Sequence, residues 1–441
     1  MRIKKVRLSN FRCFEDYALT FSDRFTLLIG DNGSGKTAVL DLLALAMSDF
    51  IRGFPRDIKP TDLRSISDDD VRYTLLLMGQ TLVRQTNAVP KIEIEGVFDN
   101  KAVCWEVIES SSWFIYEHPC TNIASQLAEN ITKPETLLPI LAYYGTGRLW
   151  KKPDSQEIET LSPDSRLLGY RDCLSPASNL DRLFRWFKTQ ELAALQKQEP
   201  RYVFEAVKKA MVSMISDADA EDAEYEGKIW WDVDWDELLI ETVVQGKRET
   251  MRFRLLSDGY RNMLGMVADI AYRMATLNPQ LQADVIKQTE GIVLIDEIDL
   301  HLHPKWQRQV VGRLLDTFPK VQFVASSHSP FIIQSLYHRE DVLLWDLETN
   351  QAVVVDSKSI EDIAENQQGV EIPQQSQRFL DMEKAAEAYY TALQKIPSVS
   401  EEEKQYLRQR LDDLLLPYSD DPAFQAFLKM ERQAADGNAR Q

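Results

Sequence analysis

The chain has 441 residues, of which 44% are hydrophobic and 27% charged, and its net charge is −18. These values indicate a globular protein with a substantial core, built as two or three domains or as one domain with large insertions. So acidic a chain gains little from general attraction to nucleic acid, and it contains no uncharged apolar run of the roughly 18 residues that a membrane span requires. Four scattered cysteines without a CxxC pair, and the lack of a signal peptide, predict a cytoplasmic protein with reduced thiols.

The first chemical motif follows a predicted strand. Residues 2–8 and 24–29 are predicted strands, and "GDNGSGKT" at Gly30–Thr37 then leads into an apolar helix. These eight residues fit G-x-x-x-x-G-K-[ST], the P-loop whose backbone N–H groups surround a polyphosphate. In this motif Lys36 reaches the β and γ phosphates and the Thr37 hydroxyl ligates Mg²⁺. We therefore predict an ATP and Mg²⁺ site, formed by Asn32, Gly33, Ser34, Gly35, Lys36 and Thr37; the alternative is an ordinary glycine turn.

The middle of the chain changes from strands to helices and back. Residues 91–116 alternate in polarity around "DN", which predicts a β-hairpin or meander, and 137–146 is a buried strand ending in a glycine turn. Residues 151–225 have helical periodicity and end in an acidic run at 217–226, which predicts a solvated loop. Strands return after 228. A helical insertion inside a strand–helix alternation predicts an α/β core that is split in sequence.

A second motif, "GIVLIDEIDLHLHP", complements the P-loop. Its apolar strand ends in Asp296 and Glu297, at the strand end where ligands gather in open α/β sheets. We expect Asp296 to hold Mg²⁺ through water and Glu297 to orient or deprotonate the attacking water. The alternative is that two acids merely end a core strand. His301 and His303 alternate as metal ligands on a strand would, but no cysteine or third histidine lies nearby.

Two further segments predict contacts with the terminal phosphate. His328 follows the predicted strand in "KVQFVASSHSP", and a neutral imidazole there can hydrogen-bond the γ-phosphate. "LLSDGYRN" at 255–262, here called the signature segment, leads from strand to helix near Ser257. A helix N-terminus with free backbone N–H groups and a serine binds an anion.

Together these motifs resemble the ATP-binding-cassette (ABC) ATPases, and "RIKKVRLSNFRCFED" resembles the first strand and turn of their RecF/SMC/OLD-like branch. Ser257 and Gly259 match the LSGGQ-like signature of that family, whereas Asp258 and Tyr260 depart from it. The resemblance implies an ABC-ATPase head with a mixed sheet and an antiparallel β subdomain, and it spans about residues 1–350. It also implies a homodimer in which the signature segment of one protomer faces the γ-phosphate held by the other, so that each dimer has two composite sites.

The strings "YYGTGR" and "DEIDLHLHP" resemble stand-alone bacterial ATPases of Septu-like anti-phage systems, in which an ATPase is paired with an HNH nuclease. That resemblance implies a dimeric, ATP-hydrolysing switch that controls such an effector. "YYGTGRLW" at 143–150 stands where the family has its Q-loop but contains no glutamine, so Arg148 is either a sensor or structural. The predicted parts are residues 1–150 and 228–350 for the ATPase head, 151–227 for the helical insertion and 351–441 for a helical tail.

Two other functions stay open at this point. One is a self-sufficient nuclease that uses Asp232, Asp234 and Asp236 as metal ligands. On a strand these acids face away from Trp231, Val233 and Trp235, which is the pattern of a half-buried strand with one wet face. The other is a RecF-like DNA-repair clamp that binds nucleic acid through the basic region Arg2–Arg12.

The tail carries no predicted catalytic residue. "SEEEKQYLRQRLDDLLL" has a good helix start and an apolar stripe, Pro417 ends that helix, and a second short stripe follows at Ala423–Leu428. Such helices bury their stripes either on their own core or on a partner, so the tail is a candidate docking element for the effector.

Overall fold

The computed structural model describes residues 1–54, 63–78, 81–86, 88–107, 119–147, 165–176, 180–198, 201–215, 227–244, 247–354 and 359–368, with isolated residues between 384 and 413. The predicted acidic loop at 217–226, Arg148 and most of the predicted tail lie outside the described residues. The chain forms two compact units, Met1–Lys358 and Ser359–Gln441. The second contains α9 (Ile360–Gln368). The predicted boundaries near residues 150, 227 and 350 stay predictions.

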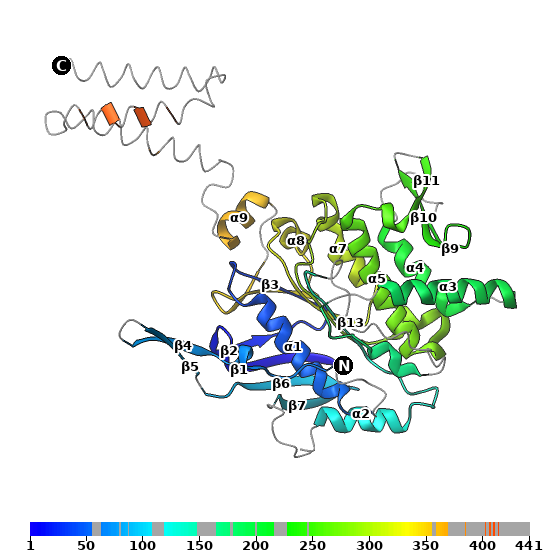
Figure 1. Ribbon diagram of the computed structural model, residues 1–441, viewed down its shortest axis with the longest axis horizontal. Helices are drawn as coiled ribbons and strands as arrows, with labels where there is room; N and C mark the ends of the chain where they lie inside the picture. Colours follow the sequence, from blue (N-terminus) through cyan, green and yellow to red (C-terminus); the bar gives the residue numbers. More distant parts are fainter. Residues whose placement is uncertain are drawn as a thin grey trace. The chain divides into compact units, whose positions relative to one another are not determined.

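A six-stranded sheet forms the centre of the first unit, in the order β15-β14-β3-β13-β12-β8 (Figure 1). Five of its strands are parallel, and the short edge strand β15 is antiparallel to β14. Every residue of β3, β8, β12 and β13 is buried, which explains their short, continuous apolar sequences. The strands are β3 (Phe25–Ile29), β8 (Ile140–Tyr144), β12 (Gly291–Ile295), β13 (Val321–Ser326), β14 (Val342–Asp346) and β15 (Gln351–Val353).

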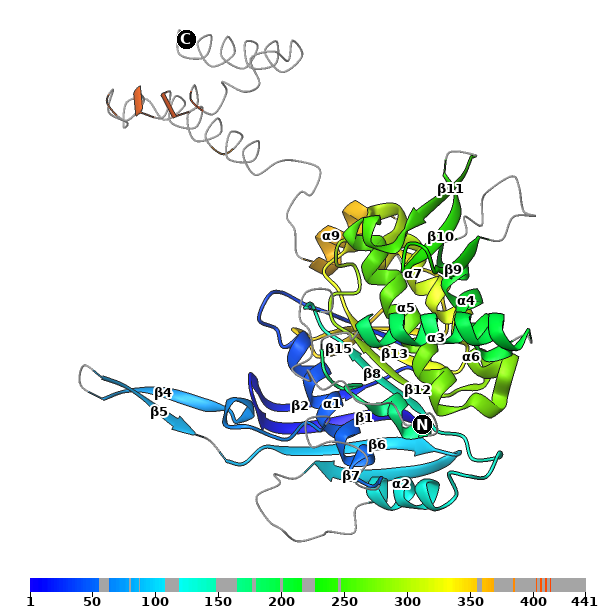
Figure 2. The same ribbon diagram turned by 45° about the vertical axis from the view of Figure 1, so that its right-hand side comes forward.

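An antiparallel sheet lies on the other side of helix α1 (Lys36–Ile51), in the order β2-β1-β6-β7 (Figure 2). Because α1 packs between two sheets, 14 of its 16 residues are buried. β6 and β7 form the predicted hairpin, and its turn residues Asp99 and Asn100 both have the positive φ that a tight two-residue turn requires. The strands are β1 (Arg2–Phe11), β2 (Phe14–Thr20), β6 (Lys91–Phe98) and β7 (Lys101–Val107); α2 (Pro119–Glu129) packs on α1.

Helices gather beside the β8 edge of the central sheet. Helix α5 (Asp258–Leu277) packs on β8 and is buried over most of its length. Around it lie η3 (Arg166–Tyr170), α3 (Leu180–Lys197), α4 (Tyr202–Ile215), η5 (Pro279–Asp284) and α6 (Val285–Gln288). A small sheet of β9 (Lys228–Asp232), β10 (Glu237–Val244) and β11 (Lys247–Arg252) adjoins them. The remaining elements are η2 (Asp68–Asp70), η4 (Phe253–Leu255), α7 (Pro304–Thr317) and α8 (Pro330–Ser335).

The predicted α/β class, with a mixed sheet and an antiparallel subdomain, is confirmed. One feature was not predicted: β4 (Tyr73–Met78) and β5 (Thr81–Thr86) form a separate two-stranded hairpin that projects from the antiparallel sheet (Figure 2). In addition, no helix in the described ranges is long and apolar enough to cross a membrane.

Candidate functional site

The P-loop connects the end of β3 to the start of α1. Gly30, Gly33 and Gly35 have φ values of 135°, 91° and 99°, in the region that favours glycine. At Gly35 the backbone also lies against β2, where an added Cβ would be 2.5 Å from the Phe14 ring and 2.8 Å from the Cys13 sulfur. The loop therefore needs glycine at this position for two independent reasons, and it delivers Lys36 as the first residue of α1.

The Lys36 side chain folds back over the loop. Its Nζ donates hydrogen bonds to the carbonyl oxygens of Gly30 at 2.7 Å and Asp31 at 2.8 Å. Burial lowers the pKa of Lys36, and the surrounding acids, first of all Asp296, oppose that shift. A cation that is partly removed from water and held over a glycine loop is suited to binding an anionic phosphate.

Three chain segments meet at Asp296. Its Oδ2 accepts a hydrogen bond from the Thr37 hydroxyl at 2.9 Å, and its Oδ1 accepts one from the Ser326 hydroxyl at 2.6 Å. Asp296 is buried, whereas Thr37 is an exposed residue, so the pair lies at the edge between the core and the surface. A carboxylate and a hydroxyl oxygen are ligands that Mg²⁺ prefers. The structure thus brings together the two predicted metal ligands, although they are 259 residues apart in sequence.

Glu297 is held in an unusual backbone conformation directly after Asp296. Its φ is +47°, a left-handed value that is uncommon for residues other than glycine. The Glu297 N–H donates to the Ser326 hydroxyl at 2.8 Å, so one serine contacts both neighbouring acids. Backbone strain of this kind concentrates at functional sites. Ser326 was not among the predicted site residues; its only sequence signal was that it follows the apolar residues 323–325 in "FVASSHSP".

The polar turn after β13 lies at the same strand ends as the acidic pair. The Ser327 hydroxyl donates to the Asp299 carboxylate, and His328 is exposed two residues beyond Ser326. Glu348, which was also not predicted, belongs to the turn between β14 and β15 and accepts a hydrogen bond from the Asp31 N–H. That turn is fixed by the Tyr17 hydroxyl, which donates to the Leu347 carbonyl at 2.7 Å.

The signature segment forms the start of α5, as predicted. Ser257 occupies the N-cap position, but its side chain makes no capping hydrogen bond. No hydrogen bond in the described part of the chain joins Ser257 or Gly259 to residues 30–37. Instead, Gly259 packs so closely on the loop after the acidic pair that an added Cβ would lie 2.3 Å from the His301 carbonyl oxygen. A cavity of about 500 Å³ opens beside them, with Tyr260 and Trp306 in its lining.

Two alternating patterns of the sequence lie outside strands, and one of them, the acidic run, was wrongly expected on a strand. His301 and His303 do not lie on a strand: His301 is in a turn with φ +62°, and His303 caps α7, its Nδ1 accepting from the Lys305 N–H at 3.2 Å. The second concerns the acidic run, because β9 ends at Asp232 and residues 233–236 form a turn.

In that turn the Asp232 carboxylate accepts the Trp235 N–H at 2.9 Å, and Asp236 pairs with Lys188. Val233 and Trp235 are 56% and 57% exposed, so they do not form the buried face of a strand. The run is a hairpin turn stabilised by its own acids. Among the described residues, no group of three or more His, Cys, Asp or Glu side chains could hold a metal ion.

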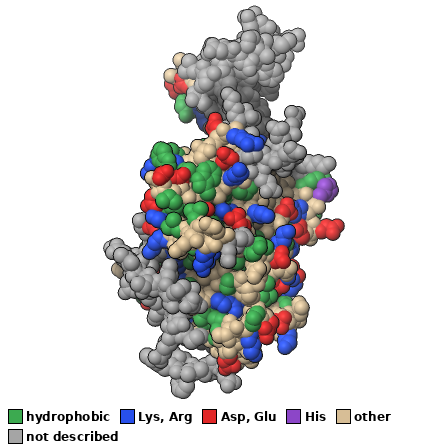
Figure 3. Space-filling model, turned by 90° about the vertical axis from the view of Figure 1, so that its right-hand side faces the viewer, with side chains coloured by type: hydrophobic (Ala, Val, Ile, Leu, Met, Phe, Trp, Pro, Cys, Tyr) green, Lys and Arg blue, Asp and Glu red, His purple; other side chains and the backbone are tan. Residues whose placement is uncertain are grey.

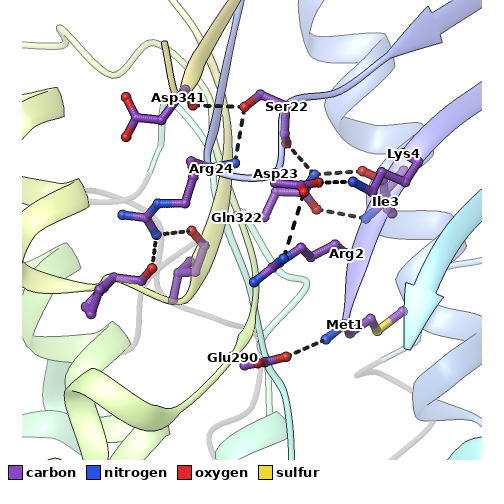
Figure 4. A network of polar contacts seen from close by, with 12 residues as sticks. Met1, Arg2, Ile3, Lys4, Ser22, Asp23, Arg24, Glu290, Gln322 and Asp341 are labelled. Atoms are coloured by element: carbon purple, nitrogen blue, oxygen red, sulfur yellow. Dashed lines mark hydrogen bonds and ion pairs between the residues drawn. The ribbon is translucent and has the colours of Figure 1, made fainter. Parts of the chain in front are cut away.

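The basic region at the N-terminus is largely neutralised by nearby acids. The terminal amine of Met1 lies 3.5 Å from Glu290, and Arg2 and Lys4 both pair with Asp23 (Figure 4). Arg12 pairs with Asp41 and Asp70. On the face shown in Figure 3, basic and acidic side chains are interspersed rather than segregated. At Arg2, Lys4 and Arg12 this arrangement weakens the attraction for phosphates, because each of these side chains already lies beside a carboxylate.

Comparisons with known proteins agree with the motifs. The family described as "AAA domain" matches residues 5–218, and the family described as "AAA domain, putative AbiEii toxin, Type IV TA system" matches residues 133–334. The chain is 28% identical to "Retron Vc95 probable ATPase" of Vibrio cholerae serotype O1 biovar El Tor, over 79% of this chain and 74% of that protein.

Two further relatives match over different lengths. The chain is 25% identical to Septu protein PtuA of Bacillus mycoides, covering 80% of this chain but only 42% of that protein. It is 30% identical to DNA replication and repair protein RecF of Idiomarina loihiensis, over 22% of this chain and 27% of that protein. The predicted relationship is confirmed: the chain is an AAA/ABC-type ATPase, related to retron ATPases, Septu protein PtuA and RecF.

Proposed function

We propose that this ATPase works as a homodimeric switch, in which ATP binding and hydrolysis control an effector protein. The observation that carries the proposal is the meeting of Thr37, Asp296 and Ser326, which places the P-loop and the acidic pair in one site. Such a site fits a Mg²⁺-bound nucleoside triphosphate, and it offers the groups that hydrolysis needs.

Each of the proposed site residues has a separate role in ATP hydrolysis. Lys36 and the P-loop N–H groups bind the β and γ phosphates, and Thr37 and Asp296 would hold Mg²⁺, which would neutralise phosphate charge. Glu297 orients a water molecule and accepts its proton as the water oxygen bonds to the γ-phosphorus. The bond from that phosphorus to the β-phosphate oxygen breaks, and ADP and phosphate are released. Ser326 keeps both acids in place, and His328 contacts the γ-phosphate from the end of β13.

The signature segment supports the dimeric part of the proposal. Ser257 makes no side-chain capping hydrogen bond, and the N-terminus of a helix such as α5 carries a partial positive charge that favours an anion. Ser257 and Gly259 therefore complete the ATP site of a second protomer. Each dimer then has two composite sites that close when ATP is bound.

The effector is proposed from the relatives. The chain resembles a retron ATPase and Septu protein PtuA, and the acidic run Asp232–Asp236 is a hairpin turn rather than a nuclease strand. The cutting activity of an anti-phage system would then belong to a separate protein, of which an HNH-type nuclease is the expected kind. The tail at 351–441 is the candidate docking element for that partner.

The test is Glu297→Gln, which keeps the size of the side chain but removes the base. We expect hydrolysis to fall by about 10²–10⁴-fold while ATP binding is retained. Lys36→Ala should instead lose ATP binding. Glu290→Gln is the matched control. Glu290 immediately precedes β12, at the end of the strand opposite to Glu297, and its carboxylate pairs with the terminal amine of Met1. Near-normal turnover by the Glu297→Gln protein would contradict the proposed role.

A further inference from the structure

A buried hydrogen-bond cluster joins the end of β8 to helix α5. The Tyr144 hydroxyl donates to Asp269 Oδ2 at 2.8 Å, and Arg273 Nε donates to the same oxygen at 2.8 Å. The other end of Arg273 is fixed as well, because its guanidinium donates to the carbonyl oxygens of Gly169 at 2.9 Å and Arg171 at 2.8 Å. Tyr144, Asp269 and Arg273 are 2%, 3% and 4% exposed, so water does not compete for these bonds.

The same tyrosine is also bound to the acidic pair. The Tyr144 carbonyl oxygen accepts the Asp296 N–H at 2.8 Å, and Tyr144 is paired with Ile295 in the register of β8 and β12. One residue therefore contacts the backbone of the proposed Mg²⁺ ligand and the side chain of a residue on α5. Gly145 follows it, so the chain can turn away immediately after the contact.

Helix α5 carries this contact to the signature segment. Asp269 lies twelve residues after Ser257, which corresponds to about 18 Å along a helix. Because α5 is buried over most of its length, a displacement at Asp269 moves its N-terminus as part of a rigid element. In the proposed dimer the N-terminus of α5 contacts the ATP bound by the partner, whereas Asp296 belongs to the site that binds ATP in its own chain.

We propose that Tyr144, through Asp269 and Arg273, is a positioning residue that couples the ATP site of one protomer to the signature segment it offers to the other. This inference rests on the proposed function and adds its regulation: occupancy of one composite site sets the geometry of the second. The two sites of a dimer then bind ATP cooperatively. Burial raises the pKa of Tyr144, so its hydroxyl keeps the proton that it donates to Asp269.

The chain offers a matched pair of variants. Tyr144→Phe removes the bond to Asp269 but leaves the Asp269–Arg273 pair intact. Tyr170→Phe removes a bond of the same kind, since the equally buried Tyr170 hydroxyl donates to the Pro139 carbonyl at 2.8 Å, next to the opposite end of β8. Both variants lose one buried tyrosine bond, so their melting temperatures should fall by similar amounts. Only the first variant removes the hydrogen bond from the β8 tyrosine to Asp269 of α5.

The experiment measures amide hydrogen exchange of the first two turns of α5, with and without Mg²⁺–ATP. It is made in a Ser257→Arg background, in which the composite sites cannot close. We expect ATP to slow this exchange about 5-fold or more, a factor at the lower end of typical allosteric coupling. This slowing should occur both in the Ser257→Arg protein and in the protein that also carries Tyr170→Phe. With Tyr144→Phe the exchange should not respond, although ATP still binds.

Equal responses in all three proteins, or ATP binding without any response of α5, would overturn the coupling while leaving the proposed ATPase function intact. A protein that binds no ATP would instead contradict the proposed function itself, and the coupling with it. In dimers without the Ser257→Arg change, the Hill coefficient for binding of a non-hydrolysable ATP analogue should fall from near 2 toward 1 with Tyr144→Phe only. An unchanged coefficient would also refute the inference.

Discussion

Gly259→Ala tests whether the start of α5 depends on close packing against the loop after the acidic pair. The added Cβ would lie 2.3 Å from the His301 carbonyl oxygen and 3.1 Å from its carbonyl carbon. Ordinary contact begins near 3.4 Å, so helix and loop must separate by about 1 Å. The loop resists this movement because His301 has a left-handed φ and two turn hydrogen bonds, Leu300 to Glu297 and Leu302 to Asp299, hold its backbone.

The expected magnitude combines two opposing effects. Alanine stabilises a helix relative to glycine by about 0.5–1 kcal/mol, whereas overpacking costs about 1–3 kcal/mol. The net result for Gly259→Ala is a loss of between about 0 and 2.5 kcal/mol. The effect on hydrolysis should be larger, about 10²-fold, because a catalytic group displaced by about 1 Å loses its alignment.

The matched control lies in the same helix. At Gly265 an added Cβ would be close only to the end of the flexible Leu180 side chain, at 3.1 Å, and would make an ordinary contact with the Phe253 ring at 3.9 Å. Gly265→Ala should therefore be neutral or stabilising, with hydrolysis near the wild-type rate. Thermal unfolding and steady-state phosphate release measure both variants. If Gly259→Ala behaves like Gly265→Ala in both assays, the close contact with His301 has no functional role.

The remaining predictions address the dimer, the acidic turn and the tail. Lys36→Ala and Ser257→Arg protomers should each be inactive but regain hydrolysis when mixed, because one of the two composite sites then carries no lesion; no recovery despite subunit exchange would refute the trans arrangement. Changing Asp232, Asp234 and Asp236 to Asn should leave hydrolysis nearly unchanged and lower stability by about 0.5–2 kcal/mol through loss of turn bonds. Mg²⁺-dependent DNA cleavage that this triple change abolishes would instead favour the nuclease function. Deleting 401–441 should preserve hydrolysis but prevent co-purification of the effector, so a truncated protein that still binds its partner fully would exclude the tail as docking element.

The sequence was informative where local chemistry decides the structure. The "DN" pair required a tight turn and became the β6–β7 hairpin, and the apolar runs at 25–29 and 291–295 became buried parallel strands. It misled where an alternating pattern was read as a strand. At 232–236 the alternation of acids is accidental, because Asp236 adopts a positive φ value that a strand does not allow.

Other features depend on contacts between distant segments. Ser326 was missed because only the pairing of β12 with β13 places its hydroxyl beside both acids. Glu348 lies 317 residues from Asp31, so no local pattern could predict that bond. The hairpin at 73–86 was missed for a different reason. The apolar residues of its strands are largely exposed, for example Leu77 at 70% and Leu82 at 64%. The strands therefore have no buried face, and their sequences do not alternate between apolar and polar residues.

The position of β3 in the central sheet has a consequence for how the protein is made. β3 is complete at Ile29, but both of its neighbours, β13 and β14, come from residues 321–346. At a synthesis rate of about 5–20 residues per second, roughly 15–60 s pass before the ribosome has added them. During that interval the glycine loop has no sheet to hold it, and Thr37 has no Asp296 to bind. A chain that ends before residue 346 therefore lacks both strands that flank β3, so nucleotide binding at the proposed site requires synthesis as far as β14.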